Sequence, residues 1–301
     1  MFQEAQLYAP ISTSEDGMVT VHLDESHPGF GDSVYRERRN QIAARALRWS
    51  AGPPAPPIPH VDYTEAEQEV WRTVSRELAA KHERLACREY RDAMAALALP
   101  TDHIPQLDEV SDQLRPLAGF EYHPAAGLVG FDQFYGSLAD GVFHSTQYVR
   151  HHARPLYTPE PDLIHEVIGH GGLMASPRFA ELKRLAGEAS RRLETQSARE
   201  FFAKVFWFSL EFGVLHEDGE LRAYGAGLLS SYGEIEEFRG AEIRPVDIAE
   251  MGVLEYDITH YQPILFAARG VDHVLEVVGE FFAECDDDSP ARLTDARSVS
   301  G

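Results

Sequence analysis

The sequence predicts a mainly α fold, a single domain of many helices with a few short strands. Three observations favour this fold. Apolar residues recur with a helical period over most of the 301 residues. In residues 123–161, glycines, prolines and aromatics occur without a helical period, which indicates loops and short strands. The chain is 44% hydrophobic and 25% charged, which is ordinary for a globular protein and sufficient for one large domain.

The helical period defines the expected elements in order. Helices are expected within residues 26–49, 64–81, 83–98, 104–120, 179–193, 199–215 and 271–283. Thr64 and Glu67 form a capping box at the start of the second helix. The proline-rich residues 50–63 before it cannot be helical and predict an extended connector.

Composition divides the chain into three parts. Residues 1–25 are mixed and polar and predict a loosely held N-terminal arm. Residues 26–283 carry the helical patterns and form the predicted domain. Residues 284–301 are polar, with consecutive aspartates and several serines, and predict a disordered tail.

Charge and cysteine content limit the partners. Lys and Arg total 27 against 49 Asp and Glu, a formal net charge of −22. Such a surface repels phosphate backbones and anionic lipids, so we expect neither a nucleic-acid nor a membrane partner. Only Cys87 and Cys285 are present, far apart and without metal-site spacing, which favours a reducing, cytoplasmic location.

The stretch PDLIHEVIGHGG places His165 and His170 five residues apart. Pro161 predicts a helix start, and the glycines around His170 predict its end. On a regular α-helix the two imidazoles would point about 140° apart. Binding of one ion by both would therefore require a local turn with i→i+5 hydrogen bonds. The alternative is a helix with one buried and one exposed histidine and no metal.

Glu211 lies within the apolar stretch 199–215, where an ionised carboxylate is costly to bury without a partner. It is either a rim carboxylate paired with an arginine or a third ligand beside His165 and His170. Two imidazoles and one carboxylate form the facial triad of non-haem Fe(II) oxygenases. A hydrolytic zinc site would instead need histidines at i and i+4 with Glu166 as base, so the spacing argues against that alternative.

Five blocks of sequence together resemble the pterin-dependent aromatic amino acid hydroxylases, and within them the phenylalanine hydroxylases. The blocks are SHPGFGDSVYRERRNQIA, IPQLDEVS, VFHSTQYVRHHARPLYTPEPDLIHEVIGH, FWFSLEFGV and LRAYGAGLLSSYGE, in family order over about residues 26–282. The resemblance implies a catalytic domain with an iron site in a central cleft. It implies His165, His170 and Glu211 as the catalytic Fe(II) ligands.

The resemblance also implies a tetrahydropterin cofactor (tetrahydrobiopterin or a bacterial pterin), O₂ and a free aromatic amino acid as reactants. Arg150 is expected to hold the substrate carboxylate. The other substrate positions carried over are Thr158, Pro159, Trp207, Phe212, Gly227 and Ser230, with Glu234 as a supporting residue. The pterin positions are Phe134, expected to stack on the ring, and Gly127, Leu128, Val129, His144, Glu166 and Ala203.

Several positions depart from the family pattern and put the identity and affinity of the pterin in question. Phe131 stands where a serine that contacts pterin is usual, Phe206 where a tyrosine is usual, and Gly171–Gly172 where an apolar residue and proline are usual; Asp140–Gly141 also departs.

Trp207 favours phenylalanine as substrate with 4-hydroxylation to tyrosine. Tryptophan 5-hydroxylation, tyrosine hydroxylation, phenylalanine 3-hydroxylation and non-catalytic binding of the amino acid or pterin stay open. The regulatory domain and the tetramer-forming helix of the animal enzymes find no counterpart in these residues, so we expect an unregulated monomer, or at most a dimer.

Overall fold

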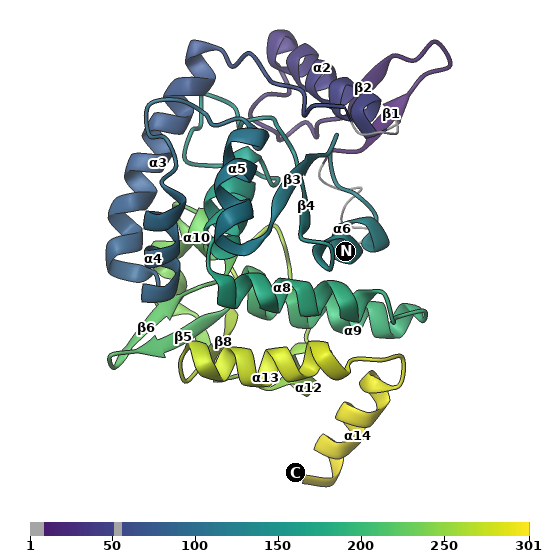
Figure 1. The fold of residues 1–301 in the computed structure, drawn as a ribbon, viewed down its shortest axis with the longest axis vertical. Coiled ribbons are helices and arrows are strands. Elements are labelled where there is room, and N and C mark those ends of the chain that lie inside the picture. The colour runs from purple at the N-terminus through teal and green to yellow at the C-terminus, as the bar shows by residue number, and fades with distance from the viewer. Residues whose placement is uncertain (1–8, 51–55, 301) are drawn as a thin grey trace.

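The computed structural model describes residues 9–50 and 56–300, and there the mainly α expectation is confirmed (Figure 1). The longer α-helices are α2 (Ser33–Ser50), α3 (Glu65–Leu85), α4 (Arg88–Leu97), α5 (Leu107–Ala118), α6 (Phe131–Leu138), α8 (Pro177–Ser190), α9 (Gln196–Phe206), α13 (Val271–Glu284) and α14 (Ser289–Ser300). The short ones are α7 (Gly172–Met174), α10 (Ala226–Ser230), α11 (Glu234–Glu237), α12 (Ile248–Met251) and the 3₁₀ turn η3 (Phe238–Gly240). Two segments, η1 (His165–Gly171) and η2 (Trp207–Glu211), are π-helices.

The strands are few and short. They are β1 (Ile11–Thr13), β2 (Val19–Val21), β3 (Glu121–Pro124), β4 (Val142–Ser145), β5 (Val214–Glu217), β6 (Glu220–Ala223), β7 (Glu242–Pro245) and β8 (Ile264–Ala268). The β1–β2 pair is antiparallel and the β3–β4 pair is parallel. The other four form one sheet in the order β6-β5-β8-β7. None of the described helices combines the length and apolar character that crossing a membrane requires.

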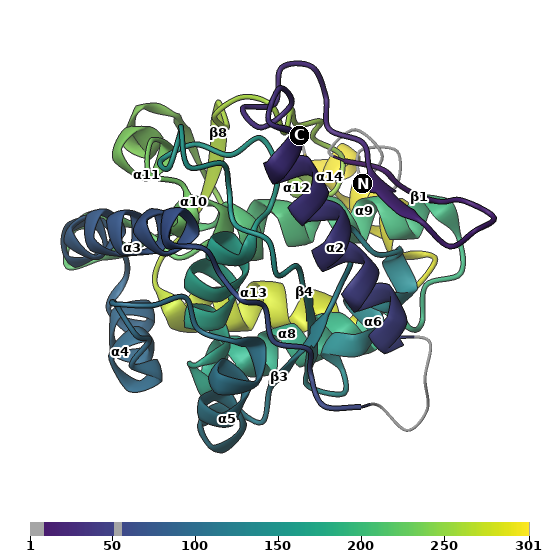
Figure 2. The ribbon, with the colours of Figure 1, turned by 90° about the horizontal axis from the view of Figure 1, so that it is seen from above.

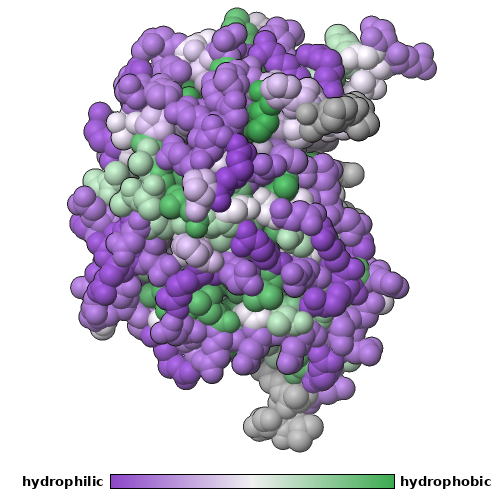
Figure 3. All heavy atoms as spheres, viewed as in Figure 1, coloured by the Kyte–Doolittle hydropathy of each residue, from purple (hydrophilic) through white to green (hydrophobic). Residues whose placement is uncertain are grey.

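The π-helix η1 lies at the centre of the packing. Helices α5, α7 and α10 contact it, and α10 also contacts η2, so one short helix joins both π-helices. On another side of the core, α8 packs against both α6 and α13 (Figure 1). Seen from above, α3 and α4 lie at one side of the molecule and α2 with the β1–β2 hairpin at another (Figure 2). The face drawn in Figure 3 is mainly hydrophilic, in keeping with the net charge of −22.

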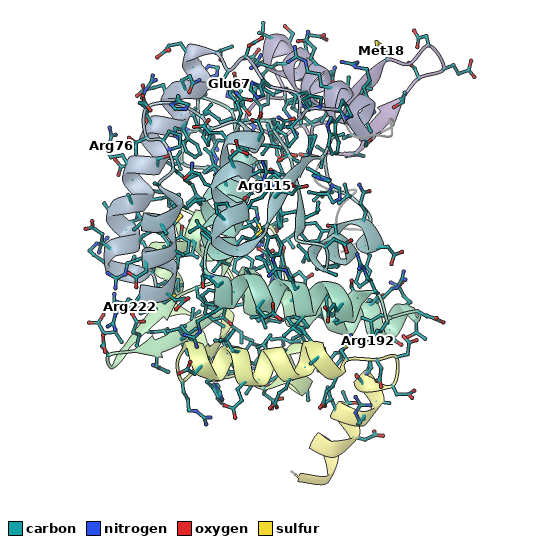
Figure 4. All side chains as sticks on the ribbon, in the orientation of Figure 1. Met18, Glu67, Arg76, Arg115, Arg192 and Arg222 are labelled. Atoms are coloured by element: carbon teal, nitrogen blue, oxygen red, sulfur yellow. The ribbon has the colours of Figure 1, made fainter. Side chains whose placement is uncertain are left out.

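The ends of the chain are more ordered than expected. Residues 289–300, expected to be disordered, form α14, which contacts α9 and α12. Asp287, which lies just before α14, connects this end of the chain to the start of α9, because its carboxylate accepts the Thr195 N–H at 2.9 Å. Arg192 donates to the carbonyls of Phe282 and Cys285 at the end of α13, where a cation is favoured (Figure 4).

The N-terminal arm also differs from the expectation. Its described part forms the β1–β2 hairpin, which packs on α2, where Asn40 Oδ1 accepts the Val21 N–H at 2.8 Å. Residues 1–8 of the expected arm and residues 51–55 of the connector lie outside the described residues. The capping box is formed as expected, since Thr64 Oγ1 accepts the Glu67 N–H and Glu67 Oε2 accepts the Thr64 N–H.

The glycines around His170 do not end the helix, contrary to the sequence interpretation, because the helix continues through α7. They permit close packing instead. A Cβ on Gly169 would lie 2.7 Å from the Ala226 carbonyl oxygen of α10, and one on Gly171 would lie 2.7 Å from Tyr122 Oη. The usual penalty for glycine inside a helix is therefore offset by the close approach of neighbouring elements.

We expect Gly169→Ala to lower the free energy of unfolding by about 1–3 kcal/mol, because the methyl group would meet backbone rather than a movable side chain. Urea unfolding followed by circular dichroism measures the change. Gly240→Ala is the matched control, since no atom lies within 4 Å of its added Cβ. Equal stability of the two variants would contradict the packing role.

Candidate metal centre and active site

The i→i+5 turn that the histidine spacing required is present. His165 and His170 both lie in the π-helix η1, in which side chains five residues apart return to nearly the same face. Glu211 ends the second π-helix, η2, where the Phe212 N–H donates to the Trp207 carbonyl at 2.9 Å, five residues back. The two elements that carry the expected ligands thus share the same rare backbone form.

The three side chains converge. His170 Nε2 lies 3.1 Å from Glu211 Oε1, and His165 Nε2 lies 3.9 Å from Glu211 Oε2. The two imidazole rings are 4.7 Å apart, centre to centre, at 86° to each other. One ligand atom from each residue lies within 4.8 Å of those of the other two, as a metal site requires.

Each imidazole is held at its far nitrogen. The Nδ1 atom of His165 lies 2.7 Å from Ser230 Oγ. The Nδ1 atom of His170 lies 3.0 Å from Lys183 Nζ, and Phe143 packs against its ring with centroids 4.7 Å apart. Both Nε2 atoms are thereby directed toward Glu211. This is the arrangement of histidine ligands whose outer nitrogen is fixed by a second residue.

The electrostatics fit a cation. Burial lowers the pKa of His165 to about 4 and that of His170 well below its usual value, so both rings are neutral, the form that binds metal. Burial raises the pKa of Glu211, which means that its anion lacks sufficient compensation from protein groups. Two neutral nitrogen donors and a buried carboxylate are a donor set that Fe(II) accepts.

Arg150, the expected substrate-carboxylate residue, is buried and bound to Asp162. Its Nε donates to Oδ2 at 2.9 Å and its Nη2 to Oδ1 at 2.8 Å. Burial alone would raise the pKa of Asp162, but Arg150 lowers it below its usual value. Asp162 Oδ1 also accepts the His165 N–H at 3.2 Å and so caps η1. The sequence analysis did not predict this ion pair.

The expected substrate residues lie on several elements. Trp207 stacks on Tyr256 at 4.3 Å and 11° and lies 4.5 Å from Phe212, centre to centre. Gly227 is close to the same wall, since an added Cβ would lie 2.7 Å from Phe212 Cζ. Thr158 and Pro159 are half-buried in the loop before η1. Aromatic side chains thus form one wall near the π-helix that carries Glu211.

Glu234, which was expected to be a supporting residue of the substrate site, forms its side-chain hydrogen bond with Gln262. Its Oε1 accepts the Gln262 N–H at 2.7 Å. Gln262 Oε1 in turn accepts the Trp207 Nε1–H at 3.1 Å, so Glu234 supports the indole through one intermediate residue. Burial raises the pKa of Glu234 to about 7.

Most of the expected pterin residues line a cavity beside η1. Its lining includes Gly127, Leu128, Val129, Phe134, His144 and Glu166. Ala203, the seventh, is buried in α9 and is not part of this lining. Phe131, which stands where a pterin-contacting serine was expected, is buried against Phe202 instead.

Two residues that line this cavity each have a buried polar atom without a hydrogen-bond partner among the described residues, namely His144 Nδ1 and Thr146 Oγ1. Burial lowers the pKa of His144 to about 4, so the ring is neutral. Leaving such groups unpaired is costly. A flat heterocycle rich in N–H and ring nitrogen atoms, such as a pterin, fits a cavity with these free atoms and an adjacent phenylalanine.

Sequence reasoning missed several residues of the site. The sequence analysis did not single out Lys183, Gln262, Thr146 or Arg39, of which Thr146 and Arg39 line the cavity. Only Lys183 carried a signal, because it is a charged residue on the inward face of the helix that begins near Phe179. The others depend on contacts between segments far apart in the chain.

The helical fold and the cluster of two histidines and one carboxylate define the class, since this cluster is typical of mononuclear non-haem iron oxygenases. Residues 13–291 match the family model described as biopterin-dependent aromatic amino acid hydroxylase. The chain belongs to this family.

Two relatives illustrate the range of similarity. Phenylalanine 3-hydroxylase of Streptomyces coeruleorubidus is 50% identical over 274 residues, covering 91% of this chain and 97% of that protein. Phenylalanine-4-hydroxylase of Bos taurus is 40% identical over 269 residues, covering 87% of this chain. The chain spans only 59% of the length of the cattle protein.

Solved structures agree on the fold. The apo phenylalanine hydroxylase of Colwellia psychrerythraea 34H matches with a TM-score of 0.72 and 31% identity, covering 80% of this chain and 92% of that one. A Chromobacterium violaceum phenylalanine hydroxylase with bound iron(III) and 7,8-dihydrobiopterin matches with a TM-score of 0.70 over 78% of this chain and 84% of that one. At 22% identity the second match concerns the fold alone.

The raised pKa of Glu234 predicts a pH-dependent stability. Folding favours the protonated form of Glu234. The free energy of unfolding therefore falls as the pH rises from about 4.5 to about 7, and it has lost the whole contribution of this group above that range. We compare the free energy of unfolding of Glu234→Gln with that of the wild type. We expect the difference, in favour of the variant, to be about 1 kcal/mol larger at pH 8.5 than at pH 6. Urea unfolding at both pH values measures this. Glu236→Gln is the control, because ion pairing lowers the pKa of Glu236 and leaves it ionised throughout.

Proposed function

We propose that this protein hydroxylates the aromatic ring of free L-phenylalanine, using Fe(II), a tetrahydropterin and O₂. The observation that carries the proposal is the convergence of His165, His170 and Glu211 within 4.8 Å, next to a cavity with free polar atoms. Iron and tetrahydropterin, bound there, would supply reductive activation of O₂ for insertion of oxygen into an aromatic C–H bond. Membership in the family supports both cofactors.

The metal ligands come from this chain alone. His165 and His170 would bind through Nε2, since their Nδ1 atoms face Ser230 and Lys183. Glu211 would supply the carboxylate and neutralise one of the two positive charges of the ion. Three protein ligands leave open positions for water, O₂ and the reaction itself.

The substrate would be oriented at two ends. Arg150 has five N–H donors, and the hydrogen bonds to the Asp162 side chain use its Nε and Nη2 atoms. Its Nη1 group is the proposed contact for the substrate carboxylate. Trp207 and Phe212 would pack on the substrate ring and keep water away from it, with Gln262 fixing the indole.

The cavity beside η1 would hold the pterin. Phe134 supplies an aromatic face, and Glu166, whose pKa is raised well above its usual value by burial and by Glu211, is suited to share a proton with a pterin N–H. His144 Nδ1 and Thr146 Oγ1 would gain partners on binding. The departures at Phe131 and Phe206 lie among buried aromatics, so they affect the shape of this region more than its polar contacts.

We propose the 3-position of the ring as the main site of attack, in place of the 4-position favoured by the sequence. A relative named phenylalanine 3-hydroxylase shares 50% identity over 97% of its length. Relatives named phenylalanine-4-hydroxylase share 40% identity over 59% of theirs, so 4-hydroxylation is the second candidate. We also propose a monomeric, cytoplasmic enzyme without nucleic-acid or membrane partners. The five-residue spacing of His165 and His170 argues against a zinc hydrolase, and membership in a hydroxylase family supports an enzyme over a non-catalytic binding protein.

Product analysis tests the proposed function. Purified protein with Fe(II), tetrahydrobiopterin and O₂ should convert phenylalanine to meta-tyrosine as the main product, separated from para-tyrosine by chromatography. We expect Glu211→Ala to lose at least about 100-fold in iron affinity and all coupled hydroxylation, because a ligand matters more than its supporting residues. Glu236→Ala, at an exposed carboxylate, is the control. Para-tyrosine as main product selects the second candidate, and absence of any hydroxylated product overturns the proposal.

Arg150→Lys tests substrate orientation. The lysine keeps a positive charge near Asp162, whereas alanine would leave that carboxylate buried and unpaired. Because a single ammonium cannot reproduce the planar fork, we expect KM for phenylalanine to rise roughly tenfold or more. Iron content should be unchanged, as measured by metal analysis. Loss of iron with an unaltered KM would show that Arg150 supports the metal centre and not the substrate.

A further inference from the structure

Two fully buried tyrosines donate hydrogen bonds to the backbone of η1, and neither has a role in the function proposed above. Tyr122, on β3, donates from its hydroxyl to the Glu166 carbonyl at 2.7 Å. Tyr90, on α4, donates to the Ile168 carbonyl at 2.9 Å. Neither side chain is exposed. Burial raises the pKa of both phenols well above its usual value, so both hydroxyls keep their protons and act as donors.

The two carbonyls that accept these bonds lie between the expected metal ligands. Glu166 and Ile168 belong to the stretch of η1 that runs from His165 to His170. Helices depart from regular α-helical hydrogen bonding at π-turns and where a side chain inserts into the backbone ladder. Each carbonyl has two lone pairs, so it can accept a hydroxyl as well as a backbone N–H. The two tyrosines are therefore placed to stabilise the wider turn that brings both imidazoles to one face.

Gly171 provides the space for the Tyr122 hydroxyl. A Cβ at this position would lie 2.7 Å from Tyr122 Oη, and its next neighbours would be 3.7 Å or more away, at ordinary contact distance. The side chain of any other residue would therefore push the hydroxyl off the Glu166 carbonyl. Gly172 has the same relation to Tyr90, since an added Cβ would lie 2.4 Å from Cε2 of that ring. The glycine pair, which departs from the family pattern, thus fits the tyrosine pair.

Tyr122 is itself fixed in place and is linked to a ligand. Its N–H donates to Ser111 Oγ at 2.9 Å. Its ring lies edge-on to that of Phe143, its partner in the β3–β4 pair, with centroids 5.7 Å apart. Phe143 in turn packs on the His170 ring. A shift of Tyr122 would therefore reach His170 both through the backbone of η1 and through Phe143.

We propose that Tyr90 and Tyr122 are positioning residues of the metal centre, which hold η1 in its i→i+5 register and thereby keep its two histidines on one face. This inference rests on the proposed iron function. Without the two hydroxyls the same segment can relax toward an α-helix, in which side chains five residues apart diverge by about 140°. Part of the free energy of iron binding would then be used to restore the turn, so the affinity for iron would fall.

Tyr122→Phe and Tyr90→Phe test the inference, because each removes a hydroxyl and keeps the ring. In the iron-free protein we expect the amide hydrogens of residues 165–174 to exchange about fivefold faster in either variant, as loss of one hydrogen bond implies. Mass spectrometry follows this exchange. The dissociation constant for Fe(II), measured by competition with a chromophoric chelator, should rise about fivefold as well. Each variant tests the inference on its own if the other does not fold.

Tyr63→Phe is the matched control. It removes a hydroxyl that donates to the Gln147 carbonyl at 2.9 Å, a backbone acceptor outside η1. We expect it to leave both the exchange of residues 165–174 and the affinity for Fe(II) as in the wild type.

A double variant separates the close contact from general packing. Gly171→Ala alone should weaken Fe(II) binding about fivefold or more, because its methyl group displaces the Tyr122 hydroxyl from its carbonyl. In the Tyr122→Phe background the same methyl group meets no oxygen and should cause little further loss. Losses that simply add in the double variant would contradict the fit between Gly171 and Tyr122.

Unchanged exchange of η1 in both tyrosine variants would overturn the inference. Faster exchange with an unchanged affinity for Fe(II) would overturn it too, since the hydroxyls would then stabilise the helix without positioning its ligands. If the wild type itself binds no iron, the proposed function fails, whereas the exchange of iron-free η1 still shows whether the tyrosines hold the turn.

Discussion

The backbone register of η1 is the constraint on which the site depends. Five residues separate its two histidines, and only i→i+5 hydrogen bonds bring side chains at this spacing to one face. A π-helix has no intrinsic advantage over an α-helix, so its surroundings must stabilise it. Asp162 caps its start, and Gly169 allows α10 to approach to backbone contact. The same α10 touches η2, so the position of Glu211 relative to the histidines is set through one short helix.

Burial of charge is the second organising feature. The chain carries a net charge of −22, and most acids lie where water solvates them. Three carboxylates around η1 are nonetheless buried, those of Asp162, Glu166 and Glu211. Asp162 has a bidentate arginine, whereas the pKa values of the other two are raised by burial. Protein groups do not fully compensate the negative charges of the Glu211 and Glu166 carboxylates. A divalent cation bound at Glu211 and a proton on Glu166 would do so.

The period of apolar residues predicted the helical fold, because it is a local pattern. The spacing of His165 and His170 left open whether one ion is bound by both or one histidine is buried and the other exposed, and the resemblance to the hydroxylases implied the set of three ligands. The interpretation of the glycines was wrong, since Gly169 and its neighbours permit contacts with distant elements that no local pattern records. The helical tail was missed for a similar reason. Asp287 joins it to the residues before α9, and this contact exists only in the folded chain.

The two halves of the site differ in how complete they are before ligands bind. The ligand imidazoles and Arg150 already have protein partners, so their orientation costs little further entropy when metal or substrate arrives. Among the residues of the cavity proposed for the pterin, His144 and Thr146 have buried polar atoms without a hydrogen-bond partner among the described residues. Of the departures from the family pattern, Phe131 and Phe206 lie among buried aromatics, whereas Gly171 and Gly172 lie at the end of η1 and the start of α7, where neighbouring side chains approach closely. The geometry of the three proposed ligands, His165, His170 and Glu211, depends on the two π-helices η1 and η2 that carry them.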